Sequence, residues 1–265
     1  MEHVAEFIRL LAGTVIYRPY VYAFLVCFLV YATYHLGWKR MITFMVMTWI
    51  IAFGSEYSTT RNGFPFGPYT YFDDTRTREL WISNVPFWDS LSFVFLGYFS
   101  FVMAAAVVSR PEELASGRWS GITSRLTPVL GGIIMMLLDV VIDPVTLQGE
   151  KWFLGRIYEY PYHGFYFGVT AANFAGWFFV GFASQWLFQR LLARAPWCRG
   201  PLRQPHPRFV WLVYAVYGGV FIFNLSITIW IQDYVLSAAS AAVSIATMLI
   251  MALLLRRKPV DGKVP

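Results

Sequence analysis

Long apolar runs limit what this chain can fold into more than any other feature of its sequence. A run of about 20 apolar residues is what an α-helix needs to cross a bilayer core of roughly 30 Å. Seven such runs can be placed: Pro19–Trp38, Met41–Glu56, Pro86–Ser109, Thr127–Leu147, Tyr166–Arg190, Phe209–Ile231 and Val235–Leu255. Only 14% of the residues are charged, against roughly 25% in soluble domains. The sequence therefore predicts an all-α, polytopic integral membrane bundle of about seven transmembrane helices.

The segments between the runs are short. The longest connections, 57–85 and 191–208, leave no room for a separate soluble domain. We therefore expect a single membrane domain over residues 1–265. In residues 1–18 apolar side chains recur at helical spacing, which predicts a helix lying along the membrane surface rather than a cleavable signal.

The distribution of basic residues predicts the orientation in the membrane. Of the 21 Lys and Arg residues, most fall on the side of the C-terminus when seven spans are assumed, including those of the loop 191–208 and the tail 256–265. Cytoplasmic segments carry such an excess, so the C-terminus is predicted to be cytoplasmic in a multi-pass protein of the inner or plasma membrane. The net charge of +6 is then a topology and anionic-lipid signal, and it requires no nucleic-acid partner.

The cysteines and histidines form no metal-binding pattern. Cys27 lies within the first run and Cys198 in a predicted loop, and the four histidines stand at no ligand spacing. We expect neither a metal site nor a disulfide between these two cysteines.

The fourth run contains two acids, Asp139 and Asp143, four residues apart. This spacing puts both on one face of a helix. An Asp near the centre of a span costs roughly 2.5–3.5 kcal/mol, so such residues usually mark a functional site. Two adjacent carboxyl groups in apolar surroundings favour keeping a proton, which the pair could donate.

Structural interpretations of both acids remain open. Pro144 disfavours helix at the residue before it, so Asp143 could instead end the helix and cap a loop. Asp139 could be a hydrogen-bonded structural acid.

Other acids raise the same question. Glu56 ends the second run and Asp89 lies shortly after the start of the third; each is either functional or an ordinary interfacial residue. The acids expected to be solvated are Asp73, Asp74, Glu79, Glu112, Glu113, Glu159 and Asp233.

Two connections are strongly aromatic. The stretch 62–71 combines Gly and Pro with four aromatic rings, which predicts a segment that folds back into the interface or caps a cavity, although an aromatic belt is the alternative. A second aromatic stretch, 152–166, lies on the same predicted side. We expect the two to meet over the same end of the bundle.

The fifth run carries Asn173 and Trp177, which share a helical face. An Asn inside a membrane helix needs a partner, which could be a carboxyl of the fourth run, a water or a backbone group. A structural interhelical bond and a catalytic role are both open.

Taken in order, several of these motifs resemble the carotenoid biosynthesis membrane proteins that include the carotenoid 1′,2′-hydratases. The similarity covers about Glu56 to Trp177. The motifs are Glu56, Asn62-Gly-Phe-Pro-Phe-Gly-Pro-Tyr-Thr-Tyr71, Asn84-Val85-Pro86, Leu138-Asp-Val-Val-Ile-Asp-Pro144 with Gly149 and Trp152, Tyr166-Phe167-Gly168, and Asn173-Phe-Ala-Gly-Trp177.

This resemblance implies an isoprenoid lyase that adds water to the terminal double bond of an acyclic carotenoid resembling lycopene or gamma-carotene. It implies no cofactor. The carboxylates that match the motifs are Glu56, Asp139 and Asp143, and the matching polar and aromatic pair is Asn173 and Trp177.

The chemistry also follows from the residue types. Hydrating an unactivated alkene requires protonation to a carbocation and then attack by water, and a buried neutral carboxylic acid suits the first step. We expect Asp139 to donate the proton, Asp143 or Glu56 to orient the water, and Asn173 to hydrogen-bond it or a carboxyl. The residues expected to contact substrate are Tyr69, Tyr71, Trp152, Tyr166 and Trp177.

Three other functions fit parts of this pattern. Acid-initiated cyclisation or isomerisation of a carotenoid needs the same proton but excludes water. A proton-coupled transporter would use Asp139 and Asp143 as a relay, and a non-catalytic pigment-binding subunit would need only the aromatic lining. The oligomeric state is open.

Overall fold

The computed structural model describes residues 2–115, 119–199, 202 and 208–256. The α-helices are α1 (Glu2–Tyr17), α2 (Pro19–Leu36), α3 (Trp38–Asn62), α4 (Phe87–Val108), α5 (Pro111–Ala115), α6 (Leu126–Thr146), α7 (Ala171–Arg194), α8 (Arg208–Trp230) and α9 (Tyr234–Leu255). The short strands are β1 (Thr70–Tyr71), β2 (Trp81–Ile82), β3 (Val85–Pro86) and β4 (Tyr158–Glu159). Single 3-10 turns occupy Asp73–Thr75, Ser120–Thr123, Gly149–Lys151 and Pro196–Cys198.

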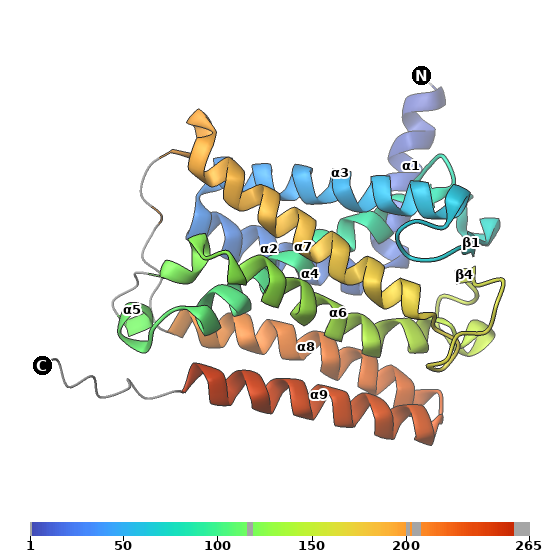
Figure 1. Cartoon of the computed structure of the whole chain (residues 1–265). Helices are drawn as coiled ribbons and strands as arrows, with labels where there is room; N and C mark the ends of the chain where they lie inside the picture. Colours follow the sequence, from blue (N-terminus) through green and yellow to red (C-terminus); the bar gives the residue numbers. More distant parts are fainter. Residues whose placement is uncertain (1, 116–118, 200–201, 203–207, 257–265) are drawn as a thin grey trace, which may run out of the picture.

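All seven predicted runs form long helices that pack side by side into one bundle (Figure 1). Six of them, α2, α3, α4, α6, α8 and α9, are long and apolar enough to cross a membrane. The remaining one, α7, is 24 residues long but carries Asn173, Gln185 and Gln189. The all-α, multi-pass membrane fold is therefore confirmed, and the crossing by α7 that completes seven spans stays a prediction.

Two helix boundaries differ from the predicted ones. The second run was predicted as the short segment Met41–Glu56 but forms the 25-residue α3, Trp38–Asn62. It lies between Gly37 and Gly63, two glycines that adopt positive φ. The fifth run starts at Ala171 rather than Tyr166. Thr170 ends the preceding loop by accepting a hydrogen bond from the Asn173 backbone N–H, a standard N-cap.

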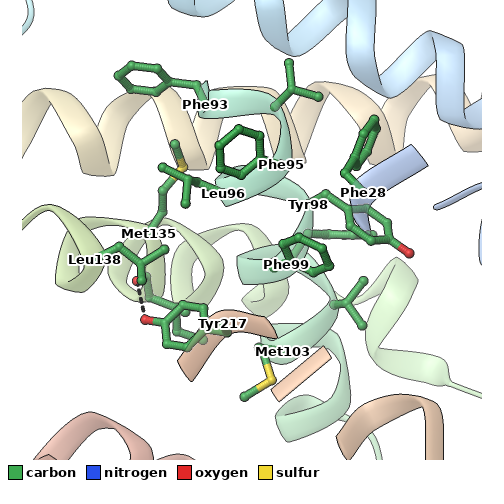
Figure 2. Packing of buried hydrophobic residues seen from close by; sticks show 14 of the residues in the cluster. Phe28, Phe93, Phe95, Leu96, Tyr98, Phe99, Met103, Met135, Leu138 and Tyr217 are labelled. Atoms are coloured by element: carbon green, nitrogen blue, oxygen red, sulfur yellow. Dashed lines mark hydrogen bonds between the residues drawn. The ribbon is translucent and has the colours of Figure 1, made fainter. Parts of the chain in front are cut away.

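The core is built around α4, whose side chains are buried along nearly its whole length. Figure 2 shows Phe93, Phe95 and Phe99 of α4 among aromatic and aliphatic side chains of the surrounding helices. The Tyr217 hydroxyl of α8 crosses to the backbone C=O of Ile134 in α6 at 2.8 Å. Because α4 is enclosed, the residues near its first turns face the protein interior.

The two aromatic connections meet at one end of the bundle, as predicted; we call this the loop end. There β1 pairs antiparallel with β4, with Thr70 opposite Glu159 and Tyr71 opposite Tyr158. The C-terminal end of α9 lies at the opposite end (Figure 1). Residues 257–265 of the predicted tail lie outside the described residues.

The predicted N-terminal helix is present as α1, which crosses the direction of the other long helices at the loop end (Figure 1). It is held there because Thr14 Oγ1 accepts a hydrogen bond from the Leu80 N–H at 2.8 Å. Gly13 packs directly on the Arg78 carbonyl, where an added Cβ would lie 2.2 Å from the oxygen. Its position along a membrane surface stays a prediction.

Candidate active site

A partly open cavity of about 140 Å³ lies at the loop end of the bundle. Its wall is formed by α2, α3, α4, α6, α7, α8 and both aromatic connections. The charged and amide side chains on the wall are Arg18, Glu56, Asp89, Asp143, Asn173 and Asn224. Most of the remaining wall is aromatic or aliphatic, so these few polar groups decide its chemistry.

On one side of the cavity, Asn173 joins the two acids of α6. Its Nδ2 donates to Asp139 Oδ2 and to Asp143 Oδ2, each at 2.7 Å. The two carboxyl groups are therefore adjacent, as their spacing predicted, and a carboxyl of the fourth run is the partner of Asn173. The helix continues through Pro144 to Thr146, so the interpretation of Asp143 as a helix-end cap is wrong.

The two acids differ in their access to the cavity. Asp143 is on the wall, and its Oδ2 also accepts a hydrogen bond from the Tyr160 hydroxyl at 3.2 Å. Asp139 is fully buried, is not among the wall residues, and its Oδ1 has no hydrogen-bond partner within the described part of the chain. Asp143 therefore faces any molecule in the cavity, with Asp139 directly behind it.

Glu56 stands on another part of the wall. Its Oε2 accepts a hydrogen bond from the Ser90 hydroxyl and its Oε1 from the Tyr71 hydroxyl, the latter at 3.3 Å. Only 3% of its surface is exposed, so these two hydroxyls fix the orientation of the carboxyl group. The interpretation of Glu56 as an ordinary interfacial residue does not fit this burial.

Beside Glu56 lies a buried ion cluster that we call the Arg18 cluster: Arg18, Glu79 and Asp89. Arg18 Nε and Nη2 donate to the two Glu79 carboxyl oxygens at 2.7 and 3.0 Å, and Nη1 pairs with Asp89. The expectation that Glu79 is solvated is wrong, because its side chain is fully buried against the guanidinium. Buried charges need such partners, but Arg18 and Glu79 are 61 residues apart, and no local pattern announces the pair.

Four tyrosines, which we call the tyrosine cluster, lie between the acids: Tyr69, Tyr71, Tyr158 and Tyr160. The ring of Tyr69 lies 5.2 Å from that of Tyr71, 5.5 Å from Tyr158 and 6.1 Å from Tyr160, measured between centroids. Burial raises the pKa of Tyr69, and likewise that of Tyr71, well above the ordinary 10.0, with the charge of Glu56 adding to the effect. These hydroxyls therefore remain neutral donors at physiological pH.

Tyr158 and Tyr160 were not predicted as site residues. The signal was present, because the alternation Tyr158-Glu159-Tyr160 puts both rings on one face of an extended segment. Burial raises the pKa of Tyr158, so its hydroxyl also stays neutral.

The other predicted substrate contacts divide into two groups. Trp177 stacks on Phe93 with centroids 4.3 Å apart, and both line the cavity, as does the buried Trp152. Tyr166 is not among the wall residues, and its ring packs against Phe167 instead.

No group of three or more His, Cys, Asp or Glu residues is arranged to hold a metal ion within the described segments.

Sequence comparisons show which known proteins this chain is similar to. A family model described as "Carotenoid biosynthesis protein" matches residues 17–251, well beyond the region that carries the motifs. Bisanhydrobacterioruberin hydratase of Haloarcula japonica is 29% identical over 144 residues, which is 54% of this chain and 43% of that protein. The match thus spans less than half the length of this curated relative. No solved structure matches the chain.

Proposed function

Because this chain belongs to the carotenoid biosynthesis protein family, we propose that it hydrates the terminal 1′,2′ double bond of an acyclic carotenoid end group. A carotenoid-modifying role follows from the family, and a partial relative that is named a hydratase supports water as the second reactant. The observation that carries the proposal is the position of Asp143, a buried carboxyl backed by a second carboxyl and facing an aromatic cavity.

In the proposed first step, Asp143 transfers a proton to the CH carbon of the terminal double bond, C2′. The electron pair of the double bond forms the new C–H bond, and the positive charge develops on the dimethyl-substituted carbon, C1′. We assign the transfer to Asp143 rather than to Asp139, which the sequence favoured, because Asp139 is not on the cavity wall. Asn173 holds both carboxyl groups in place through its Nδ2, and the adjacent Asp139 carboxyl shares the proton with Asp143.

In the second step, water adds to C1′ and loses a proton, which returns to a carboxylate. One water is consumed and a tertiary alcohol is formed, so protons and electrons balance and no cofactor is required. Glu56 is the proposed residue that orients the water, since its carboxyl is fixed by Ser90 and Tyr71. Neutral aromatic faces stabilise a nearby cation, and the stacked Trp177 and Phe93 present such faces in the cavity.

The predicted topology indicates on which side of the membrane the reaction takes place. If the C-terminus is cytoplasmic, the loop end and its cavity lie at the other side of the membrane, since the two ends are opposite (Figure 1). The substrate and the surrounding lipid are the proposed partners of the chain.

The test is expression of the chain in a lycopene-producing host, with mass analysis of the extracted carotenoids and an empty-vector control. Hydration adds the mass of one water per end group, whereas cyclisation or isomerisation leaves the mass unchanged. Absence of any hydroxylated product from every acyclic carotenoid offered would refute the proposal.

A further inference from the structure

The cavity wall extends from the acids to a place where side chains of α2 and α8 contact each other. On this side its wall includes Tyr20 and Phe24 of α2 and Val220 and Phe223 of α8. The rings of Tyr20 and Phe223 stack with centroids 4.9 Å apart and an angle of 17° between their planes. We call Tyr20, Phe24, Gly219 and Phe223 the α2–α8 seam.

The seam separates the cavity from the surroundings by the thickness of single side chains. Tyr20, Phe24 and Phe223 are only partly buried although all three line the cavity, so each contributes to both surfaces. Gly219 of α8 lies directly opposite Phe24 of α2, since an added Cβ would lie 3.8 Å from the Phe24 ring.

Outside the seam the surface is apolar. Tyr22 is 46% exposed and Ile222 68% exposed, on α2 and α8 respectively. Exposed apolar side chains on helices long enough to cross a membrane face the acyl chains of the lipid. The seam therefore lies between an apolar cavity and an apolar surrounding.

The loop end is closed much more firmly. There the Arg18 cluster joins α2 to the connection before α4, and β1 pairs with β4. Separating these elements would expose buried charges, whereas parting the rings of the seam breaks no ion pair. An acyclic carotenoid is far longer than the end group that the acids act on, so its remaining chain must leave the cavity through a wall.

We propose that the α2–α8 seam is the lateral opening through which the end group enters from the bilayer, and that it holds the apolar polyene chain during the reaction. This inference rests on the proposed function for the identity of the occupant. Tyr20, Phe24 and Phe223 are then the side chains that part around the polyene.

The test compares two tryptophan substitutions in the purified full-length protein. Gly219→Trp fills the seam, while Gly54→Trp adds the same ring at an exposed position of α3 where nothing lies within 4 Å of the added Cβ. Lycopene that copurifies per mole of protein is measured by absorbance, and hydrated product by mass. We expect Gly219→Trp to lower the bound pigment about tenfold and Gly54→Trp to leave it unchanged, with Gly219→Ala in between.

A short acyclic isoprenoid with the same terminal double bond separates blocked entry from general damage. Gly219→Trp is expected to reduce conversion of the long substrate about tenfold more than that of the short one. Equal losses for both substrates, or lycopene binding equal to that of Gly54→Trp, would overturn the inference, as would loss of bound phospholipid without loss of lycopene. Pigment that binds through the seam without forming an alcohol would refute the proposed hydration and leave the inference standing.

A second variant covers the case in which Gly219→Trp fails to fold. Phe223→Leu removes one ring of the stacked pair and should speed the exchange of bound lycopene into lipid vesicles about threefold or more. Phe179→Leu removes a ring that is 39% exposed on α7 and contacts Phe64 instead. Exchange rates that are equal in these two variants would contradict a role of the seam.

Discussion

Two groups of buried acids share one cavity, and they are balanced in different ways. The α3–α4 group consists of Glu56 of α3, Asp89 of α4 and Glu79 of the connection between them. In this group, Asp89 is paired with the guanidinium of Arg18, which also binds Glu79. In the α6–α7 group, Asp139 and Asp143 share the amide of Asn173, and no Lys or Arg is paired with either within the described residues. Acids with a buried cation can remain ionised, whereas adjacent acids without one are best accommodated by keeping a proton. The difference assigns a structural role to the Arg18 cluster and proton transfer to the α6–α7 group.

The largest expected effect comes from removing the cation of the first group. Arg18→Met would leave the charges of Glu79 and Asp89 buried and unpaired. Breaking such a pair typically costs about 3–5 kcal/mol, and Arg18 is 3% exposed while Glu79 is fully buried. We expect a large drop in the free energy of unfolding, measured by denaturant titration in detergent micelles.

The matched control is Arg9→Met, which breaks an exposed pair with Glu6 on α1. Exposed pairs contribute little, so this variant should unfold like the wild type. If Arg18→Met had no more effect than Arg9→Met, the first group would not depend on its cation.

The second prediction concerns the proton source. Asp143→Asn keeps the shape of the side chain and removes the acid, so carotenoid hydration should fall roughly 10²–10⁴-fold, the usual contribution of a positioned acid. Product is measured by mass at equal amounts of protein. Asp233→Asn is the control, because Asp233 caps α9 away from the cavity wall. Loss of activity in Asp139→Asn but not in Asp143→Asn would return the donor role to Asp139.

These two groups were not equally predictable from the sequence. Asp139, Asp143 and Asn173 were found because one helix repeats every 3.6 residues and because membrane-embedded polar groups need partners. Which of the two acids faces the cavity depends on how α6 is rotated against its neighbours, and the spacing of the acids does not determine that rotation. In the structure it is Asp143. Arg18 could not be found as a site residue in this way, since its partner Glu79 lies in a distant loop.

The same contrast holds for the fold. Hydropathy predicted the long helices, and loop composition predicted that the aromatic connections meet at one end, which β1 and β4 confirm. The extension of α3 to Asn62 was missed, because the run is less apolar beyond Glu56, while the helix ends only where Gly63 adopts a positive φ.

The third prediction uses Tyr69, which contacts the side chains around both groups. Burial raises the pKa of Tyr69 well above the ordinary 10.0. Below pH 10.0 its hydroxyl is neutral in the folded and in the unfolded chain, so stability is unaffected. Above it the unfolded chain loses this proton while the folded chain keeps it, and the free energy of unfolding falls by up to about 1.4 kcal/mol per pH unit.

Tyr69→Phe should therefore lose stability less steeply than the wild type as the pH rises above 10.0, as measured by denaturant titration at several alkaline pH values. Tyr162→Phe serves as the control, since Tyr162 is 74% exposed, and it should keep the slope of the wild type. Equal slopes in Tyr69→Phe and the wild type would show that the hydroxyl is not held neutral by the fold.

The smallest effect tests the contrast most directly, because each group accepts a hydrogen bond from a tyrosine hydroxyl. The Tyr160 hydroxyl donates to Asp143 at 3.2 Å and the Tyr71 hydroxyl to Glu56 at 3.3 Å. One such hydrogen bond contributes about 0.5–1.5 kcal/mol, so Tyr160→Phe should lower hydration about two- to tenfold. If the α6–α7 group supplies the proton, Tyr71→Phe should have a smaller effect on the rate of the first turnover. A larger effect of Tyr71→Phe would reverse the assignment. The proton would then come from Glu56, and Asp139 and Asp143 would have the structural role.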